Sequence, residues 1–178
     1  KSLVDGVDVC VSSWNRPAPN TFPVQAKAAG HYTNAQLIKM EAIANGYAEG
    51  LVLSPDGRLS EGGGQNVFLV RDGTIFTPQL DGTLLRGITR DAIMTLAADM
   101  NFEVQERPVP REDIYTADEV FFTGTATEVT PVRSVDHITI GEGRPGPITL
   151  AIQKRFLAVA KGQEQDLHGW LTPVVQSL

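Results

Sequence analysis

The residue with the clearest chemical potential is Lys27, one of five lysines in a chain of 178 residues. It lies in the uncharged stretch Gln25-Ala26-Lys27-Ala28-Ala29-Gly30, immediately before a segment with helical periodicity. An amine becomes a useful nucleophile and base when its surroundings disfavour the ammonium form, and an apolar Ala/Gly frame acts in that direction. The alternative interpretation is an ordinary surface lysine.

Other residues could support a lysine that binds a pyridine cofactor. Such a cofactor needs a carboxylate at its ring nitrogen, which Glu61 could supply. It also needs a phosphate anchor, which the free N–H groups of a helix N-terminus and a threonine hydroxyl provide at Ile88 and Thr89. Taken singly, Glu61 is also typical of a hairpin cap, and Tyr32 and Thr125 are typical structural residues.

Several other chemistries lack their motifs. The sequence has no G-x-x-x-x-G-K-[ST] loop for nucleotide phosphates and no G-x-S-x-G nucleophile elbow. Three histidines, His31, His137 and His168, show no metal-ligand spacing, so no metal is expected. The glycines of "SEGGGQN" are by themselves more typical of a bulge at the start of a strand than of a phosphate loop.

The composition fits one globular α+β domain. Hydrophobic residues make up 42% and charged residues 20%, and the net charge of -6 argues against a nucleic-acid or anionic-membrane partner. Small molecules are therefore the expected partners, and no apolar run is long enough to span a membrane. The single cysteine, Cys10, excludes an internal disulfide and fits a reducing cytoplasm.

Periodicity and turn signals place the elements. Asp56-Gly57 and Asp72-Gly73 are strong hairpin signals within a region that predicts an antiparallel meander. A helix over residues 33–45 has Thr33 or Asn34 as its candidate N-cap. Strands are expected at 7–13, 51–53, 66–70, 74–76 and 102–109, a strand-turn-strand unit at 118–136, and further helices at 87–102 and 146–163.

Four motifs then resemble one family in the same order along nearly the whole chain: "AKAAGHY", "GYAEGLVLSPDGRLSEGGGQNVFLVRDGTIFTP", "LLRGITRDAI" and "DEVFFTGTATEVTPV". They are similar to the branched-chain amino acid aminotransferases, which are pyridoxal-phosphate enzymes of the D-amino-acid-aminotransferase-like fold type IV. The resemblance implies an α+β fold with a mostly antiparallel sheet or pseudo-barrel flanked by helices. It also implies that residues 1–178 form the large, C-terminal, cofactor-binding domain, without the small domain that precedes it in this family.

The resemblance carries roles to individual positions. It makes Lys27 the lysine that binds the cofactor covalently and moves the substrate proton, Tyr32 the partner of the phenolic oxygen, and Glu61 the partner of the pyridine nitrogen. Phosphate contacts are implied for Ile88, Thr89 and Thr125, and backbone contacts to the substrate carboxylate for Thr125 and Ala126.

Two features depart from the family pattern. Gln65 stands where relatives often carry an acid, which affects the tuning of groups around the cofactor. The family's additional phosphate-binding arginine and most of its side-chain pocket belong to the preceding small domain.

The implied activity is transamination between leucine, isoleucine or valine and 2-oxoglutarate, giving branched-chain 2-oxo acids and L-glutamate. A cytoplasmic homodimer or higher homo-oligomer is expected. Sister activities of the same fold, on D-amino acids or aminodeoxychorismate, share Lys27 and Glu61, although "SEGGGQNVF" and "GITRDAI" favour the branched-chain group. A non-catalytic fragment or binding module is the alternative of another class, because a chain without the small domain lacks half of the pocket.

Overall fold

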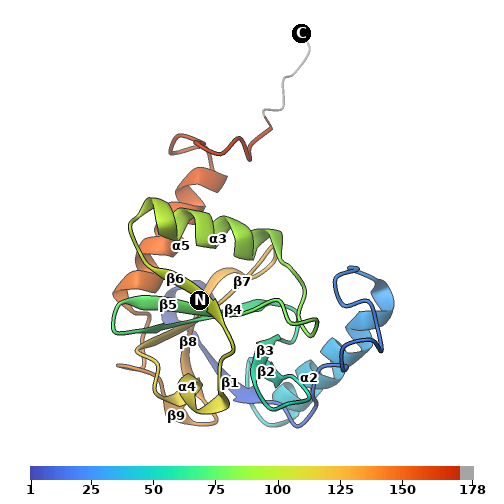
Figure 1. Cartoon of the computed structure of the whole chain (residues 1–178). Helices are drawn as coiled ribbons and strands as arrows, with labels where there is room; N and C mark the ends of the chain where they lie inside the picture. The colour runs from blue at the N-terminus through green and yellow to red at the C-terminus, as the bar shows by residue number, and fades with distance from the viewer. Residues whose placement is uncertain (173–178) are drawn as a thin grey trace.

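A computed structural model describes residues 1–172. Nine strands form one curved mixed sheet in the order β3-β2-β1-β8-β7-β4-β5-β6, with β9 beside β8 (Figure 1). The strands are β1 (Val7–Val11), β2 (Glu49–Leu53), β3 (Leu59–Gly62), β4 (Asn66–Arg71), β5 (Thr74–Pro78), β6 (Val104–Arg107), β7 (Glu119–Gly124), β8 (Glu128–Val135) and β9 (Ile138–Thr139).

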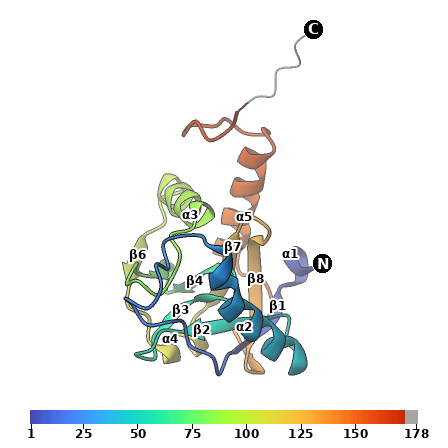
Figure 2. The ribbon, with the colours of Figure 1, turned by 90° about the vertical axis from the view of Figure 1, so that its right-hand side faces the viewer.

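Helices cover both sides of this sheet. Helices α3 (Ile88–Asp99) and α5 (Pro147–Ala160) lie side by side on one face, and α2 (Tyr32–Ala44) packs on β2 at the other side of the molecule (Figures 1 and 2). The short helices are α1 (Ser2–Asp5), α4 (Arg111–Tyr115) and a 3-10 turn at Ala29–His31. This arrangement confirms the expected α+β class with a mostly antiparallel sheet.

Strand alternation divides the core into two clusters. Phe121 of β7 faces α3 and α5, where its ring stacks on Phe68 of β4 with 5.1 Å between centroids. The next residue, Phe122, points to the opposite face and packs in the cluster under α4. Because successive side chains of a strand point to opposite faces, one pair of neighbouring phenylalanines supplies both cores.

The turn signals of the sequence are confirmed. Asp56-Gly57 joins β2 to β3, and Asp72-Gly73 joins β4 to β5 with positive φ angles of 51° and 79° at its two residues. Pro147 is the first residue of α5, and Gly162, with φ of 65°, follows its end. Cys10 is buried, and burial raises the pKa of its thiol to about 11.

Several expectations about local structure are wrong. Helix α2 begins at Tyr32, and neither Thr33 nor Asn34 is its N-cap, because the 3-10 turn before it has His31 at the cap position. The side chain of Asn34 instead binds the loop after β1, where it donates to the Asn15 carbonyl at 3.0 Å. The meander expected over residues 51–76 is also wrong, because the antiparallel hairpins β2–β3 and β4–β5 are separated in the sheet by β1, β8 and β7. The sheet is mixed, since β1 pairs in parallel with β2 and β8, and β5 with β6.

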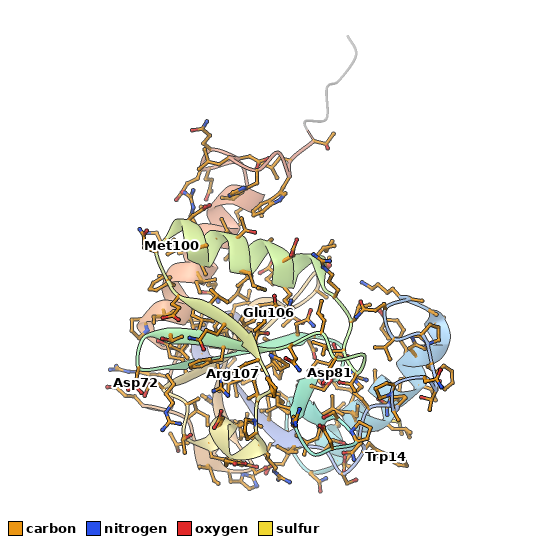
Figure 3. All side chains as sticks on the ribbon, viewed as in Figure 1. Trp14, Asp72, Asp81, Met100, Glu106 and Arg107 are labelled. Atoms are coloured by element: carbon orange, nitrogen blue, oxygen red, sulfur yellow. The ribbon has the colours of Figure 1, made fainter. Side chains whose placement is uncertain are left out.

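Buried charges fasten α3 and α5 to the sheet. Arg90 of α3 is 2% exposed and contacts Glu106 of β6 at 2.7 Å, next to the sheet edge where Figure 3 labels Glu106 and Arg107. On β7, the buried Glu119 carboxylate accepts the N–H groups of Ile148 and Thr149, at 3.0 and 2.7 Å. A carboxylate at a helix N-terminus satisfies N–H groups that have no partner within the helix.

Replacing this distant cap should therefore destabilise the protein. Glu119→Ala leaves two buried or half-buried N–H groups of α5 without their acceptor, so we expect the free energy of unfolding to fall by about 1–3 kcal/mol. Urea unfolding measures the change, and Glu112→Ala, at an exposed position of α4, is the matched control. Equal losses in the two variants would contradict the capping role of Glu119.

Candidate active site

A cavity of about 330 Å³ opens where loops meet the ends of several strands. Its walls come from the loop between β1 and α2, the turn between β3 and β4, the start of α3, and the turn between β7 and β8. Trp14 and Asp81, labelled in Figure 3, lie on this side of the molecule, which also carries α2. Every residue singled out from the sequence lines this cavity: Lys27, Tyr32, Glu61, Ile88, Thr89, Thr125 and Ala126.

Glu61, near the end of β3, is a buried carboxylate in the cavity wall. Its Oε1 lies 3.0 Å from Nε of Arg16. Its Oε2 accepts two hydrogen bonds, one from the Leu85 N–H at 3.3 Å and one from Nδ2 of Asn66 at 3.4 Å. Burial raises the pKa of this carboxyl to about 7, against the opposing charge of Arg16. The carboxyl of Glu61 therefore titrates near neutral pH. Arg16, Leu85 and Asn66 fix its position in the cavity wall.

Arg16 is the important residue that the sequence analysis missed. It is 8% exposed, and its Nη2 donates to the carbonyls of Gly62 and Gly63 at 2.7 and 2.8 Å. Its Nη1 donates to Oδ1 of Asn34 at 2.8 Å. Its contact with Glu61 is an ion pair rather than a well-directed hydrogen bond. The available signal was a lone arginine in the Pro-rich segment "NRPAPN", just upstream of Lys27.

The start of α3 is open to the cavity. Its N-cap, Gly87, provides no side-chain cap, and the first bond within the helix runs from the Asp91 N–H to the Gly87 carbonyl at 3.0 Å. The N–H groups of Ile88 and Thr89 therefore have no partner inside the helix. A side chain at position 87 would overlap Oδ1 of Asn66, so glycine is required for this close approach. Thr89 is 8% exposed, while Ile88 is 82% exposed.

Lys27 lies on the exposed loop between β1 and α2. Its neighbours Ala26 and Ala28 are exposed as well, so the expectation that an apolar frame encloses the amine is wrong for this structure. The loop is fixed by Gln25, which donates to the Leu84 carbonyl at 3.2 Å and accepts the Arg86 N–H at 3.3 Å. These bonds hold Lys27 on the same cavity wall as the start of α3.

Tyr32 and His31 form the neighbouring part of the rim. Tyr32 is the first residue of α2 and is 47% exposed, with its side chain lining the cavity. His31 also lines the cavity and meets the exposed Phe22 ring edge-on at 5.5 Å. From the sequence, His31 is considered only as a metal ligand. Among residues 1–172 no cluster of three or more His, Cys, Asp or Glu residues could hold a metal ion.

The turn between β7 and β8 closes the remaining side. Thr125 and Ala126 are exposed to the cavity and lie just beyond the Gly124–Glu128 pair that ends the ladder. Glu128 has a φ of 53°, in the left-handed region that a tight turn can require. The turn thus presents short side chains and backbone to the cavity, which leaves room for a ligand.

Thr123, on β7, is a second residue that the sequence analysis did not single out. It is fully buried and lines the cavity, and its hydroxyl has no hydrogen-bond partner in the part of the chain that the structure describes. Leaving a buried hydroxyl without a partner costs about 1–3 kcal/mol. This hydroxyl lies behind the cavity wall, out of contact with the cavity itself.

Gln65 has a structural explanation. Its Nε2 donates to Oε2 of the buried Glu49 at 2.9 Å, and its Oε1 accepts the Gly64 N–H at 3.0 Å. Glu49 also contacts Nζ of Lys39 at 3.1 Å. An acid at position 65 would place a second carboxylate against Glu49, so the neutral amide suits this particular network.

Comparisons with known proteins find one family along the chain. The profile of the family "Amino-transferase class IV" matches residues 1–135. The branched-chain-amino-acid aminotransferase of Salmonella typhimurium is 52% identical over 174 residues, which cover 98% of this chain and 56% of that protein. The chain thus spans little more than half the length of such relatives.

Solved structures give the same result. The Escherichia coli branched-chain amino acid aminotransferase superposes with a TM-score of 0.93 at 51% identity, covering 95% of this chain and 56% of that one. The T.th. branched-chain amino acid aminotransferase, solved with N-(5'-phosphopyridoxyl)-L-glutamate, has a TM-score of 0.92 at 42% identity. The match covers 97% of this chain and 57% of that one.

Within the described residues, no helix has the length and apolar character needed to cross a membrane.

The raised pKa of Glu61 predicts a pH dependence of stability in the protein without ligand. Between the ordinary pKa of 4.5 and the folded value of about 7, the folded state holds a proton that the unfolded state has released. The free energy of unfolding should therefore fall as pH rises through this window. Urea unfolding at several pH values should show a steeper fall for the parent than for Glu61→Gln. Parallel profiles, with Glu112→Gln as the exposed control, would contradict the assignment.

Proposed function

This chain belongs to the amino-transferase class IV family, and we propose that it is the cofactor-binding domain of an aminotransferase that uses pyridoxal phosphate and acts on branched-chain L-amino acids. The observation that carries the proposal is one cavity that joins a buried carboxylate, a lysine and an uncapped helix N-terminus. The names of relatives above 50% identity support branched-chain substrates over the sister activities.

The residues present fit this cofactor in charge and in spacing. The Asn66 side chain bonds Glu61 through Nδ2, and its Oδ1 abuts Gly87, so a single side chain separates the carboxylate from the start of α3. A ligand with a basic ring nitrogen and an anionic tail can therefore meet both groups at once. The phosphopyridoxyl group bound by the T.th. relative has this form.

When bound, pyridoxal phosphate supplies an electron sink for the substrate carbon that loses a proton. Glu61 would accept a hydrogen bond from the protonated ring nitrogen, and Arg16 keeps Glu61 oriented and favours its anionic form. The N–H groups of Ile88 and Thr89, with the hydroxyls of Thr89 and Thr125, would hold the phosphate. These contacts fix the two ends of the ring system.

Lys27 would bind the cofactor covalently and then, once displaced by the substrate amine, carry a proton between two carbon atoms. Its place on a loop suits this exchange, because the side chain has to leave and return while Gln25 holds the backbone. Tyr32, next to it on the rim, would donate its hydroxyl hydrogen to the phenolic oxygen of the ring. Lys27 and Tyr32 would thereby both contact the side of the ring at which the reaction takes place.

The substrate would be held mainly by backbone. The N–H groups at Thr125 and Ala126 would bind its carboxylate, because the turn between β7 and β8 opens to the cavity. A small domain preceding this large one would supply the walls that contact the apolar substrate side chain and 2-oxoglutarate. It would also supply an additional arginine that binds the cofactor phosphate. A cytoplasmic homodimer or higher homo-oligomer completes the proposal.

The assignment of Lys27 can be tested by covalent trapping. Borohydride reduction of the protein with pyridoxal phosphate, followed by peptide mapping, should place the pyridoxyl group on Lys27. Lys39 is the internal comparison, because its Nζ already contacts the Glu49 carboxylate. A label mainly on Lys39, or equal labelling after Lys27→Ala, would contradict the role of Lys27.

The activity can be tested by supplying the small domain that the proposal places before this one. We expect the 178-residue chain to transaminate leucine with 2-oxoglutarate near background rates, since positioning of the substrate contributes several orders of magnitude. A chimera that places the N-terminal segment of the Escherichia coli relative before Lys1 should regain turnover, and Glu61→Gln in this chimera should lose well over tenfold. Full turnover by the chain alone would contradict the two-domain proposal, and an inactive but folded chimera that binds cofactor would contradict the branched-chain assignment.

A further inference from the structure

The side chain of Asn66 lies between the two parts of the cavity that the proposed ligand would use. It is 6% exposed, and its Nδ2 donates to the Leu85 carbonyl at 2.9 Å and to Oε2 of Glu61 at 3.4 Å. Both neighbours accept hydrogen bonds, so the amide nitrogen must face them and the amide oxygen must face the other way. This oxygen, Oδ1, approaches Gly87.

Gly87, the N-cap of α3, fits closely against that oxygen. Its φ of -76° and ψ of 134° lie in the extended region that any residue adopts, so the backbone conformation does not require glycine. A Cβ at position 87 would nevertheless lie 2.0 Å from Oδ1 of Asn66. Its next neighbours, Cγ of Asn66 and Cβ of Arg90, would be 3.2 and 3.5 Å away. The amide of Asn66 is therefore what excludes a larger residue at position 87.

This exclusion keeps the start of α3 open. The common N-cap residues are serine, threonine, aspartate and asparagine, whose side chains bond the N–H groups of the first turn. Glycine has no such group, and no side chain of the described residues caps α3. Asn66 thus contacts the Glu61 carboxylate on one side and, on the other, the residue that leaves the helix start free.

The sheet holds Asn66 in this position. Asn66 is the first residue of β4, and it pairs with Thr123 of β7 in the antiparallel ladder. The Leu85 N–H also donates to Oε2 of Glu61 at 3.3 Å, which closes a network of three residues. One amide therefore connects β3, β4 and the loop before α3.

We propose that Asn66 is a positioning residue, which fixes the spacing between the Glu61 carboxylate and the start of α3 so that one ligand can contact both. This inference rests on the proposed function and deepens it. A ligand that binds two groups at once gains affinity when the protein already holds those groups at the matching distance. A ligand that binds only one of them gains little. The role of Asn66 needs no direct contact with the ligand.

The test compares a ligand that reaches both groups with two ligands that reach one each. Dissociation constants are measured for pyridoxal phosphate and pyridoxal by absorbance titration, and for inorganic phosphate by competition with pyridoxal phosphate. In Asn66→Ala, Arg16 and the Leu85 N–H still hold Glu61. We therefore expect about tenfold weaker binding of pyridoxal phosphate and less than about threefold change for pyridoxal or for phosphate. Asn66→Asp keeps the size but turns an oxygen towards two acceptors, so pyridoxal phosphate should bind at least as weakly as in Asn66→Ala.

A second measurement tests the contact between Asn66 and Gly87. Gly87→Ala should weaken the binding of pyridoxal phosphate, because the new methyl group displaces Oδ1 of Asn66. In the Asn66→Ala background that oxygen is gone, so Gly87→Ala should add little further loss. Equal losses in the two backgrounds would overturn the contact on which the inference rests.

Gln153 provides the matched control. Its Nε2 also joins two segments of the chain, since it donates to the carbonyls of Leu3 and Val129 at 2.9 and 2.8 Å, but it does not line the cavity. Urea unfolding should show a loss of stability in Gln153→Ala as in Asn66→Ala. All three dissociation constants of Gln153→Ala should equal those of the parent.

The remaining outcomes separate the inference from the proposed function. Parent-like binding of pyridoxal phosphate by Asn66→Ala or Asn66→Asp, equal losses for the three ligands, or an equal loss in Gln153→Ala would overturn the role of Asn66 and leave the cofactor assignment standing. A parent that binds neither pyridoxal phosphate nor pyridoxal would overturn the proposed function, and the inference with it.

Discussion

The buried pair of Arg16 and Glu61 is the contact on which the site depends. Taking both charges out of water costs several kcal/mol per ion, so the pair persists only where further bonds satisfy it. Arg16 obtains them from the carbonyls of Gly62 and Gly63 and from Asn34. One guanidinium thus joins the loop after β1, helix α2 and the end of β3, and it orients the Glu61 carboxylate that this strand contributes.

The sheet and the loops each contribute residues to the cavity. Two apolar clusters, on opposite faces of the sheet, bury the side chains of the strands. Asn66 connects the sheet to the loops, since it begins β4, donates to the Leu85 carbonyl at 2.9 Å and contacts Gly87. Lys27, by contrast, stands on a loop held by a few side-chain bonds. In the proposed reaction, groups on strands and at a helix start would therefore hold a ligand at its ends, and Lys27, which would have to move, lies on an exposed loop.

Local signals explain which features could be predicted from sequence. Asp72-Gly73 and Pro147 act through backbone angles that depend on the residue itself, so the hairpin and the helix start were confirmed. Strand β3 was missed because "LSEGG" has no apolar alternation, and the parallel pairing of β1 with β8 depends on residues more than 100 positions apart. Motifs identified the candidate site residues, but the partner of Glu61 lies 45 positions upstream in Arg16, and no periodicity connects them.

The charges around the cavity explain which ligand this acidic protein can accept. The chain has a net charge of -6, yet besides His31 the charged side chains of the wall are Arg16, Lys27 and Glu61, two cations and one carboxylate. The uncapped start of α3 adds positive potential. An anion is therefore favoured near α3 although the protein as a whole repels it. At the other end, a protonated ring nitrogen would lower the pKa of Glu61 from about 7, because a nearby cation favours the carboxylate. Binding of such a ligand and ionisation of Glu61 then stabilise each other, so the carboxylate gains its full charge when the ligand that needs it is bound.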